Sequence, residues 1–235
     1  MEIQENRVQE KTQTRAGYPQ RIARLLLGLV LFSIGSYLTI QANIGLAPWE
    51  AFSMGVSTAT GTSYGNILVL SGFVILLIDI VLKEKIGFGT VLDMLLIGKF
   101  VDLWRWMELV PMMDRFLPGL GLLLLGQVCI CVASCFYIGA GFSCGPRDAL
   151  MVALGKRFPK TPIGLIRGLI EGSVLLVGWL LGAKVGIGTV IAVFGIGFIL
   201  QLTFKLLRFD VTAVVQEDLL QTVRGMRKEI AAAEK

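Results

Sequence analysis

Six long apolar stretches alternate with short polar segments along the chain. They cover residues 25–40, 67–82, 86–106, 117–138, 165–183 and 185–207. At a rise of about 1.5 Å per residue, helices of this length cross, or nearly cross, a hydrocarbon core of about 30 Å. In lipid, a helix satisfies every backbone donor within its own segment. The pattern therefore predicts six membrane-spanning helices.

Two shorter segments lie between the first and second stretches and between the fourth and fifth. Residues 48–60 and 146–158 hold 13 residues each. As helices they would be about 20 Å long, which is short for a full span. Each begins with proline and has an acid two positions later, Glu50 or Asp148, which is typical of a helix start. We interpret both as half-helices that enter the membrane from one side.

The two halves of the chain repeat one another. Gly87-Phe88-Gly89-Thr90-Val91 returns 99 residues later as Gly186-Ile187-Gly188-Thr189-Val190. Pro48-Trp49-Glu50-Ala51 returns 98 residues later as Pro146-Arg147-Asp148-Ala149. A repeat of this length in an apolar chain is typical of the duplicated bundles of transporters. We predict an N-terminal tail, two membrane repeats and a C-terminal amphipathic helix, over residues 1–21, 22–107, 117–207 and 208–235.

The number of spans sets the topology of the repeat. Three spans in each half invert the second half relative to the first, with both termini in the cytoplasm. Of the 22 Lys and Arg residues, only Arg105, Arg115 and Lys184 then fall outside, and Lys99 lies within a span. If both short segments cross fully, eight spans give a parallel repeat, and the charge pattern fits almost as well. The short length of the half-helices favours the inverted arrangement, in an all-α polytopic bundle.

Composition agrees with a membrane protein and excludes several chemistries. The chain is 54% hydrophobic and 17% charged, with a mean hydropathy of +0.73, whereas soluble domains are about 25% charged. It has no histidine, which removes the commonest metal ligand and proton shuttle. We expect no enzyme activity, catalytic residue, metal or cofactor. The net charge of +5 lies mostly in tails and connections, so we expect no nucleic-acid partner. Four cysteines are interpreted as packing residues: Cys129, Cys131, Cys135 and Cys144.

Polar residues at the starts of the half-helices form the first candidate site. In an inverted repeat the two ends would face a common central cavity, where free N–H groups and the helix dipole favour an anion. The candidate substrate-binding residues are Pro48, Trp49, Glu50, Pro146, Arg147 and Asp148. The structural alternative is that Glu50 and Asp148 only cap their own helices and that Trp49 is an interfacial anchor.

Charged residues within the spans form the second candidate site, because a charge in the bilayer is costly unless it is paired or solvated. Asp93, Lys99 and Asp102 lie on the third span, and Lys99 and Asp102 share a helix face on which they can pair. Arg167 and Glu171 are four residues apart on the fifth span. These residues are either structural ion pairs or part of an ion or proton pathway.

Small residues mark two further features. Gly164, Gly168 and Gly172 recur at four-residue steps, which is typical of close packing between membrane helices and is also compatible with a sliding surface. The Gly-x-Gly-Thr segments begin the third and sixth spans, where glycine allows a tight turn and threonine caps the next helix.

The C-terminal stretch has one apolar helical face. Its members are Val211, Val215, Leu219, Val223, Met226 and Ile230. We interpret it as a helix on the membrane surface or on the bundle, and a partner-binding helix is the alternative.

Four segments link the chain to a known family. They are Gly45-Leu46-Ala47-Pro48-Trp49-Glu50, Gly145-Pro146-Arg147-Asp148-Ala149-Leu150-Met151, Gly178-Trp179-Leu180-Leu181-Gly182 and Val185-Gly186-Ile187-Gly188-Thr189-Val190. Through them the chain resembles the YczE/YyaS/YitT group of bacterial integral membrane proteins, most closely its YczE-like branch, over about residues 25–204. The resemblance implies the multi-pass architecture and a location in the bacterial inner membrane, and it carries no biochemical activity with it.

Two functions remain open from the sequence. We favour a small secondary permease or exporter, considered also as a homodimer, that binds a small polar or anionic solute between the repeats. Glu50, Arg147 and Asp148 would line its site. The alternative is an accessory protein that assists a larger membrane or biosynthetic system and uses its C-terminal helix as the contact. The lipid bilayer and the solute are the partners that we expect.

Overall fold

The described part of the protein is entirely helical. The computed structural model describes residues 17–84, 86–143, 145–210 and 214–233, and no strand occurs among them. The helices are α2 (Tyr18–Gln41), α3 (Pro48–Thr60), α4 (Tyr64–Val81), α5 (Phe88–Met107), α6 (Phe116–Gly139), α7 (Pro146–Arg157), α8 (Ile163–Leu180), α9 (Ile187–Leu206) and α10 (Leu219–Ala233). The predicted all-α class is confirmed.

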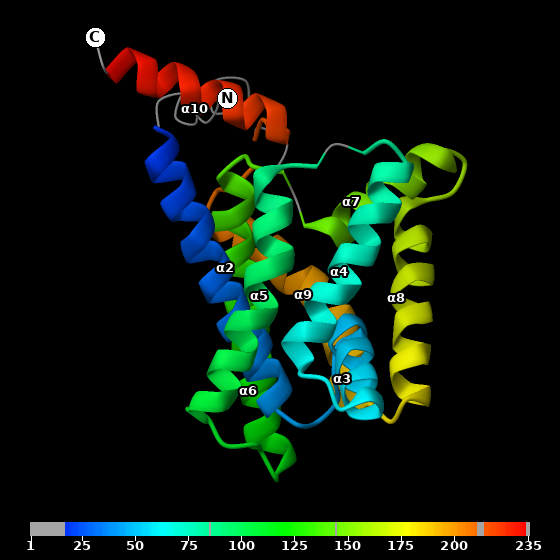
Figure 1. Cartoon of the computed structure of the whole chain (residues 1–235). Coiled ribbons are helices and arrows are strands. Elements are labelled where there is room, and N and C mark those ends of the chain that lie inside the picture. The colour runs from blue at the N-terminus through cyan, green and yellow to red at the C-terminus, as the bar shows by residue number, and fades with distance from the viewer. Residues whose placement is uncertain (1–16, 85, 144, 211–213, 234–235) are drawn as a thin grey trace.

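Four of these helices are long and apolar enough to cross a membrane. They are α2, α4, α6 and α9. Two further helices, α5 and α8, run along the same bundle but carry charged residues within their length (Figure 1). The multi-pass character that the sequence predicts is therefore supported, and the number of six spans stays a prediction.

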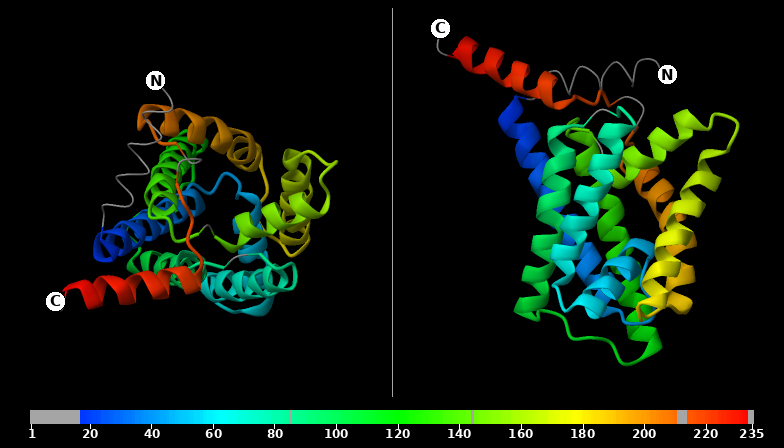
Figure 2. Two further views of the ribbon diagram at one scale, coloured as in Figure 1. Left: turned by 90° about the horizontal axis from the view of Figure 1, so that it is seen from above. Right: turned by 45° about the vertical axis from the view of Figure 1, so that its right-hand side comes forward.

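The long helices alternate in direction (Figure 1). Helices α2, α5 and α8 run away from the end of the bundle that carries α10, whereas α4, α6 and α9 run toward it. The short helix α3 lies near the far end, and the short helix α7 lies near the α10 end. The two views in Figure 2 show the same placement. The two short helices therefore sit at opposite ends of the bundle.

The centre of the bundle is the pair formed by α2 and α6, which make the most extensive contact between two helices. Glycines allow this approach, because a Cβ at Gly35 would lie 2.7 Å from the carbonyl oxygen of Gly126, and the reverse distance is the same. Around this pair the core contains fully buried side chains such as Leu25, Leu29 and Val101. Backbone proximity of this kind is how membrane helices gain packing energy without a hydrophobic driving force.

Both Gly-x-Gly-Thr segments cap the helix that they begin. The Oγ1 atom of Thr90 accepts a hydrogen bond from the backbone N of Gly87 at 3.3 Å. In the second half, Thr189 Oγ1 accepts from the backbone N of Gly186 at 3.2 Å. The threonines are almost fully buried, which confirms the predicted cap.

The same segments also form backbone hydrogen bonds to the loops that precede the short helices. The backbone N of Gly89 donates to the carbonyl of Phe142 at 2.8 Å, just before α7. The backbone N of Gly188 donates to the carbonyl of Ile44 at 2.9 Å, just before α3. Each half of the chain therefore holds the loop that leads into the short helix of the other half.

The C-terminal segment is bound to the first turn of α2. Arg21, which is only 8% exposed, forms an ion pair with Glu217 at 2.6 Å. Glu229 in α10 accepts from the backbone N of Tyr18 at 3.0 Å. The helix α2 therefore begins at Tyr18, within the predicted tail 1–21, and residues 1–16 of that tail lie outside the described residues.

The predicted apolar face of the C-terminal stretch is only partly described. Leu219 and Val223 lie on α10 and are exposed, and Val215 precedes the helix. Val211 and the side chain of Ile230 lie outside the described residues, as does Cys144. Three cysteines that are described, Cys129, Cys131 and Cys135, carry free thiols, in agreement with a packing role.

Candidate functional site

The first turns of α3 and α7 meet inside the bundle. The guanidinium carbon of Arg147 lies 4.6 Å from the centroid of the Trp49 ring. These two residues hold the same position in the two Pro-x-acid segments. A cation–π contact of this kind contributes about 0.5–2 kcal/mol, more when it is desolvated. The structure thus brings the predicted residues of the two short helices together through the contact of Trp49 with Arg147.

Glu50 is a buried acid with a full set of donors. Its Oε1 atom accepts from the hydroxyls of Ser36 at 3.0 Å and Thr39 at 2.8 Å, both on α2. Its Oε2 atom accepts from the backbone N of Ala47 at 3.4 Å. The side chain, 8% exposed, therefore caps its own helix and ties α3 to α2. The structural alternative for Glu50 describes its contacts well.

Asp148 is bound more loosely than its counterpart. Its Oδ2 atom accepts from the hydroxyl of Tyr137 at 3.5 Å, a long hydrogen bond. Tyr137 follows Thr39 by 98 residues, so the two hydroxyls hold equivalent positions ahead of the two acids. Asp148 also interacts electrostatically with Arg167 and Arg147. It thus keeps acceptor capacity that Glu50 has already used.

Asp93 of α5 joins this group. A Cβ placed on Gly145, the residue before α7, would lie 2.8 Å from its Oδ2 atom. Its carboxylate interacts electrostatically with Arg147 and Asp148. Asp93 therefore belongs with the starts of the short helices, although the sequence grouped it with the other charges of its own helix.

Lys99 and Asp102 do not form the expected ion pair. The Nζ atom of Lys99 donates to Asn66 Oδ1 at 2.5 Å, and Asp102 Oδ1 accepts from the backbone N of Gly65 at 2.8 Å. The pairing prediction was wrong because the start of α4 lies against this face of α5 and supplies a partner to each residue. Both charges fasten α5 to α4.

Arg167 and Glu171 do pair on α8. The Nε atom of Arg167 lies 2.7 Å from Glu171 Oε1, as their four-residue spacing predicts. Arg167 also interacts electrostatically with Asp148 and Tyr137. Its side chain is nevertheless 51% exposed. The pair therefore borders the group formed by α5 and α7.

These contacts define a central charged group that is drawn from four helices. Its members are Glu50 of α3, Asp93 of α5, Arg147 and Asp148 of α7, and Arg167 and Glu171 of α8. It contains four carboxylates and two guanidinium groups. Negative groups therefore outnumber positive groups when all are ionised.

Two buried or half-buried polar side chains, those of Tyr137 and Asp79, were not predicted from the sequence as parts of a site. Tyr137 could have been found by aligning the two halves, since it replaces Thr39 ahead of the second acid. Asp79 of α4 is fully buried, and within the described chain neither of its carboxylate oxygens has a hydrogen-bond partner. The sequence feature that could have identified Asp79 is an acidic residue inside the apolar stretch 67–82.

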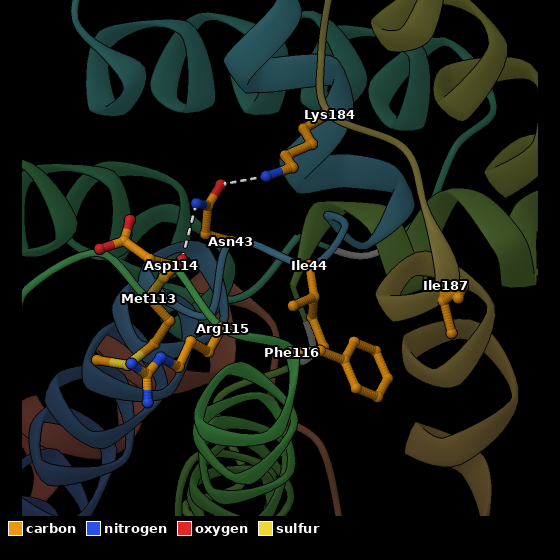
Figure 3. Close-up of a pocket in the computed structure, with 8 residues that line it drawn as sticks. All are labelled: Asn43, Ile44, Met113, Asp114, Arg115, Phe116, Lys184 and Ile187. Atoms are coloured by element: carbon orange, nitrogen blue, oxygen red, sulfur yellow. Dashed lines mark hydrogen bonds between the residues drawn. The ribbon is translucent and has the colours of Figure 1, made fainter.

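A pocket of about 260 Å³ opens among the loops that connect α2 to α3, α5 to α6 and α8 to α9 (Figure 3). Lys184 Nζ donates to Asn43 Oδ1 at 2.7 Å, and Asn43 Nδ2 donates to the carbonyl of Met113 at 2.9 Å. Arg115 also lines it. The sequence did not predict this pocket, which contains two of the three basic residues expected on the outer side.

Known proteins resemble the chain over nearly all of the helical bundle. Residues 19–205 match a family described as a family of unknown function, DUF6198. The chain is 32% identical over 183 residues to an uncharacterized protein of Haemophilus influenzae, a match that covers 77% of this chain and 81% of that protein. It is 27% identical over 176 residues to the uncharacterized membrane protein YczE of Bacillus subtilis, covering 74% and 80% of the two chains.

A third relative extends the same picture. The uncharacterized protein YyaS of Bacillus subtilis is 26% identical over 175 residues, covering 71% of this chain and 84% of that protein. No solved structure matches the chain. The predicted resemblance to YczE-like membrane proteins is confirmed, and the matched region contains the whole central charged group. The chain belongs to the DUF6198 family, whose function is unknown.

Proposed function

We propose that this protein is a small secondary transporter with six spans, in which the second half is inverted relative to the first. The alternating run of the long helices and the placement of α3 and α7 at opposite ends support this topology. So do the helix contacts, since α2 packs on α5 as α6 packs on α9, and α3 crosses α8 as α7 crosses α4. Inverted repeats with a site between them are a common transporter architecture.

One observation carries the transport proposal. The first turns of two short helices meet through Trp49 and Arg147, and the carboxylates of Asp93 and Asp148 interact electrostatically with Arg147. Ionisable groups within a membrane bundle are expensive, and they commonly mark substrate or ion pathways. The central charged group is therefore the proposed binding site, in a bacterial membrane with both termini in the cytoplasm.

The charges of the site favour one class of solute. Glu50 already accepts from the backbone N of Ala47, so an anion would compete with a carboxylate at the start of α3. The four carboxylates also exceed the two guanidinium groups. A small polar solute that is neutral or carries an amine therefore fits better than an anion, and Asp148, Asp93 and Arg147 are its proposed contacts.

Flux in proteoliposomes tests this site. A thermal-shift screen with amines, amino acids and sugars selects solutes, whose uptake is then measured for Asp148→Asn and Arg147→Gln. We expect uptake to fall by roughly tenfold or more for each variant, the cost of about 1.4 kcal/mol of lost interaction. The exposed residues Asp114 and Arg157 provide matched controls, Asp114→Asn and Arg157→Gln, which should retain uptake. Wild-type uptake in both site variants would exclude the central site.

An accessory role is favoured by one different observation. Leu220 and Val223 of α10 are 67% and 57% exposed at the end of the bundle. A partner helix or the lipid surface would cover such residues. If the protein is an accessory factor, Leu220→Gln with Val223→Gln abolishes the cellular phenotype while Asp148→Asn preserves it. These substitutions leave Glu217 in place, so the anchor to Arg21 is retained.

A further inference from the structure

The two halves of the bundle differ at one pair of helices. In the first half α4 packs against α5 through glycines: a Cβ at Gly98 would lie 2.6 Å from the carbonyl oxygen of Gly65, and a Cβ at Gly65 would overlap the carbonyl of Gly98. The residues 99 positions later are Gly164 of α8 and Gly197 of α9. A Cβ at either of these would meet nothing within 4 Å. The second half therefore has the same two glycines without their contact.

Neighbouring side chains show the same difference. Asn66 and Lys99 touch across α4 and α5, with Asn66 Oδ1 and Lys99 Nζ 2.5 Å apart. Their counterparts are Leu165 and Phe198, which are 55% and 71% exposed. The first half thus makes both a glycine contact and a side-chain contact, and the second half makes neither.

The path of α8 explains where the opening lies. At its C-terminal end α8 packs closely against α3: a Cβ at Gly178 would lie 2.5 Å from the backbone of Ala51. The short connection 181–186 joins this end to α9, and the two helices diverge toward the α10 end of the bundle (Figures 1 and 2). Among helix pairs, α4 and α5 make a substantial contact that α8 and α9 lack.

Arg167 supplies a chemical reason to place water in this opening. It stands next to Gly168 on α8, interacts with Asp148 and is half exposed. A guanidinium group that faced lipid would be disfavoured, even when it is paired with Glu171. Arg167 is therefore better solvated if the side of α8 near the glycine face borders water.

We propose that α8 is a gate that closes against α9 by bringing Gly164 onto Gly197, as Gly65 lies on Gly98 in the first half. This inference rests on the proposed inverted repeat and transport function. The structure is then the state in which the central charged group opens toward the α10 end. Closure pivots at the contact of Gly178 with Ala51 and excludes water from Arg167. An inverted repeat that exchanges the conformations of its halves opens the other end in turn.

Disulfide cross-linking in liposomes tests the gate. Two cysteine pairs are made in a variant without the four native cysteines: Asn66→Cys with Lys99→Cys, and Leu165→Cys with Phe198→Cys. The first pair should cross-link on oxidation in nearly all molecules. The second should also form its disulfide, because α8 visits α9 in the closed state. A pair outside the closing register, Leu169→Cys with Phe194→Cys, should not react. In the first half it is Gly72 that meets Met94 of α5, and the counterpart Leu70 lies two positions from Gly72, on the other face of α4.

Two outcomes would overturn the gate. One is that the 165–198 disulfide does not form in membranes in which the 66–99 disulfide does. The other is that Leu165→Cys alone yields disulfide-linked dimers as readily as the double variant yields its internal cross-link. The glycine face would then be an interface between two copies of the chain.

Uptake measurements separate this inference from the transport proposal. The 165–198 disulfide should lower uptake of a selected solute by roughly tenfold or more, and a reductant should restore it, because a locked gate stops the cycle. If the 165–198 disulfide forms in a protein that takes up no solute, the movement of α8 is supported and the transport proposal is excluded. Uptake without cross-linking would retain transport and exclude this gate.

Discussion

Glu50 and Asp148 hold equivalent positions in the two halves, and their surroundings give them different work. Glu50 accepts hydrogen bonds from two hydroxyls and one backbone N. Asp148 accepts one long hydrogen bond from Tyr137 and lies among guanidinium groups. The first acid is therefore suited to hold a short helix in place, and the second is suited to meet a solute.

This difference predicts unequal stability losses. Glu50→Ala leaves the buried hydroxyl of Ser36 without its acceptor, at a cost of about 1–3 kcal/mol, whereas the hydroxyl of Thr39 keeps the carbonyl of Ser36 as an acceptor. Asp148→Ala should cost clearly less, and it should impair uptake instead. Thermal unfolding in detergent and uptake in proteoliposomes measure the two effects. Equal destabilisation by both substitutions would contradict the assignment.

The short helices depend on contacts that cross between the halves. Gly188 approaches the loop before α3 so closely that a Cβ would lie 2.8 Å from the carbonyl carbon of Ile44. Gly89 approaches the loop before α7 in the same way, with a Cβ 2.8 Å from the carbonyl oxygen of Phe142. A methyl group at either site must push the loop and its short helix away.

We therefore expect Gly188→Ala to destabilise the protein by about 1–3 kcal/mol, the usual cost of overpacking. The matched control is Gly121→Ala in α6, where a Cβ would meet nothing within 4 Å and alanine favours the helix. Thermal unfolding midpoints compare the two variants. A loss at Gly121 as large as that at Gly188 would mean that the approach to Ile44 is unimportant.

The sequence predicts the positions of the helices well and the contacts between them poorly. Apolar stretches and the Pro-x-acid starts place α3 and α7 within one residue, because a proline start is a local signal. The first turn of α2 was missed because its polar residues are stabilised by Glu217 and Glu229, about 200 residues away. In the same way Asp93 joins α7 and Lys99 joins α4 through packing that hydropathy does not encode.

The whole molecule presents its two short helices at opposite ends, and the proposed six spans turn this into a test of topology. Ser63 lies before α4 at one end, and Lys156 lies near the end of α7 at the other. Both residues are exposed.

Cysteines at these two positions, in a cysteine-free protein, should be labelled from opposite sides of intact cells or vesicles. A membrane-impermeant maleimide should reach Ser63→Cys from outside, whereas Lys156→Cys should react only after the membrane is opened. Eight spans would place both positions in the cytoplasm, so equal protection of the two sites would exclude the inverted arrangement.

The backbone hydrogen bonds by which each half holds a loop of the other also bear on how the protein is synthesised and how it evolved. The ribosome completes the loop before α3 long before it makes Gly188, so that loop waits for its partner until most of the chain is in the membrane. A gene that encoded only one half would lack the segment that holds its own short helix. If the halves are inverted as proposed, its product could acquire that segment from a second copy inserted in the opposite orientation, and a dual-orientation dimer would then be the forerunner of the fused chain.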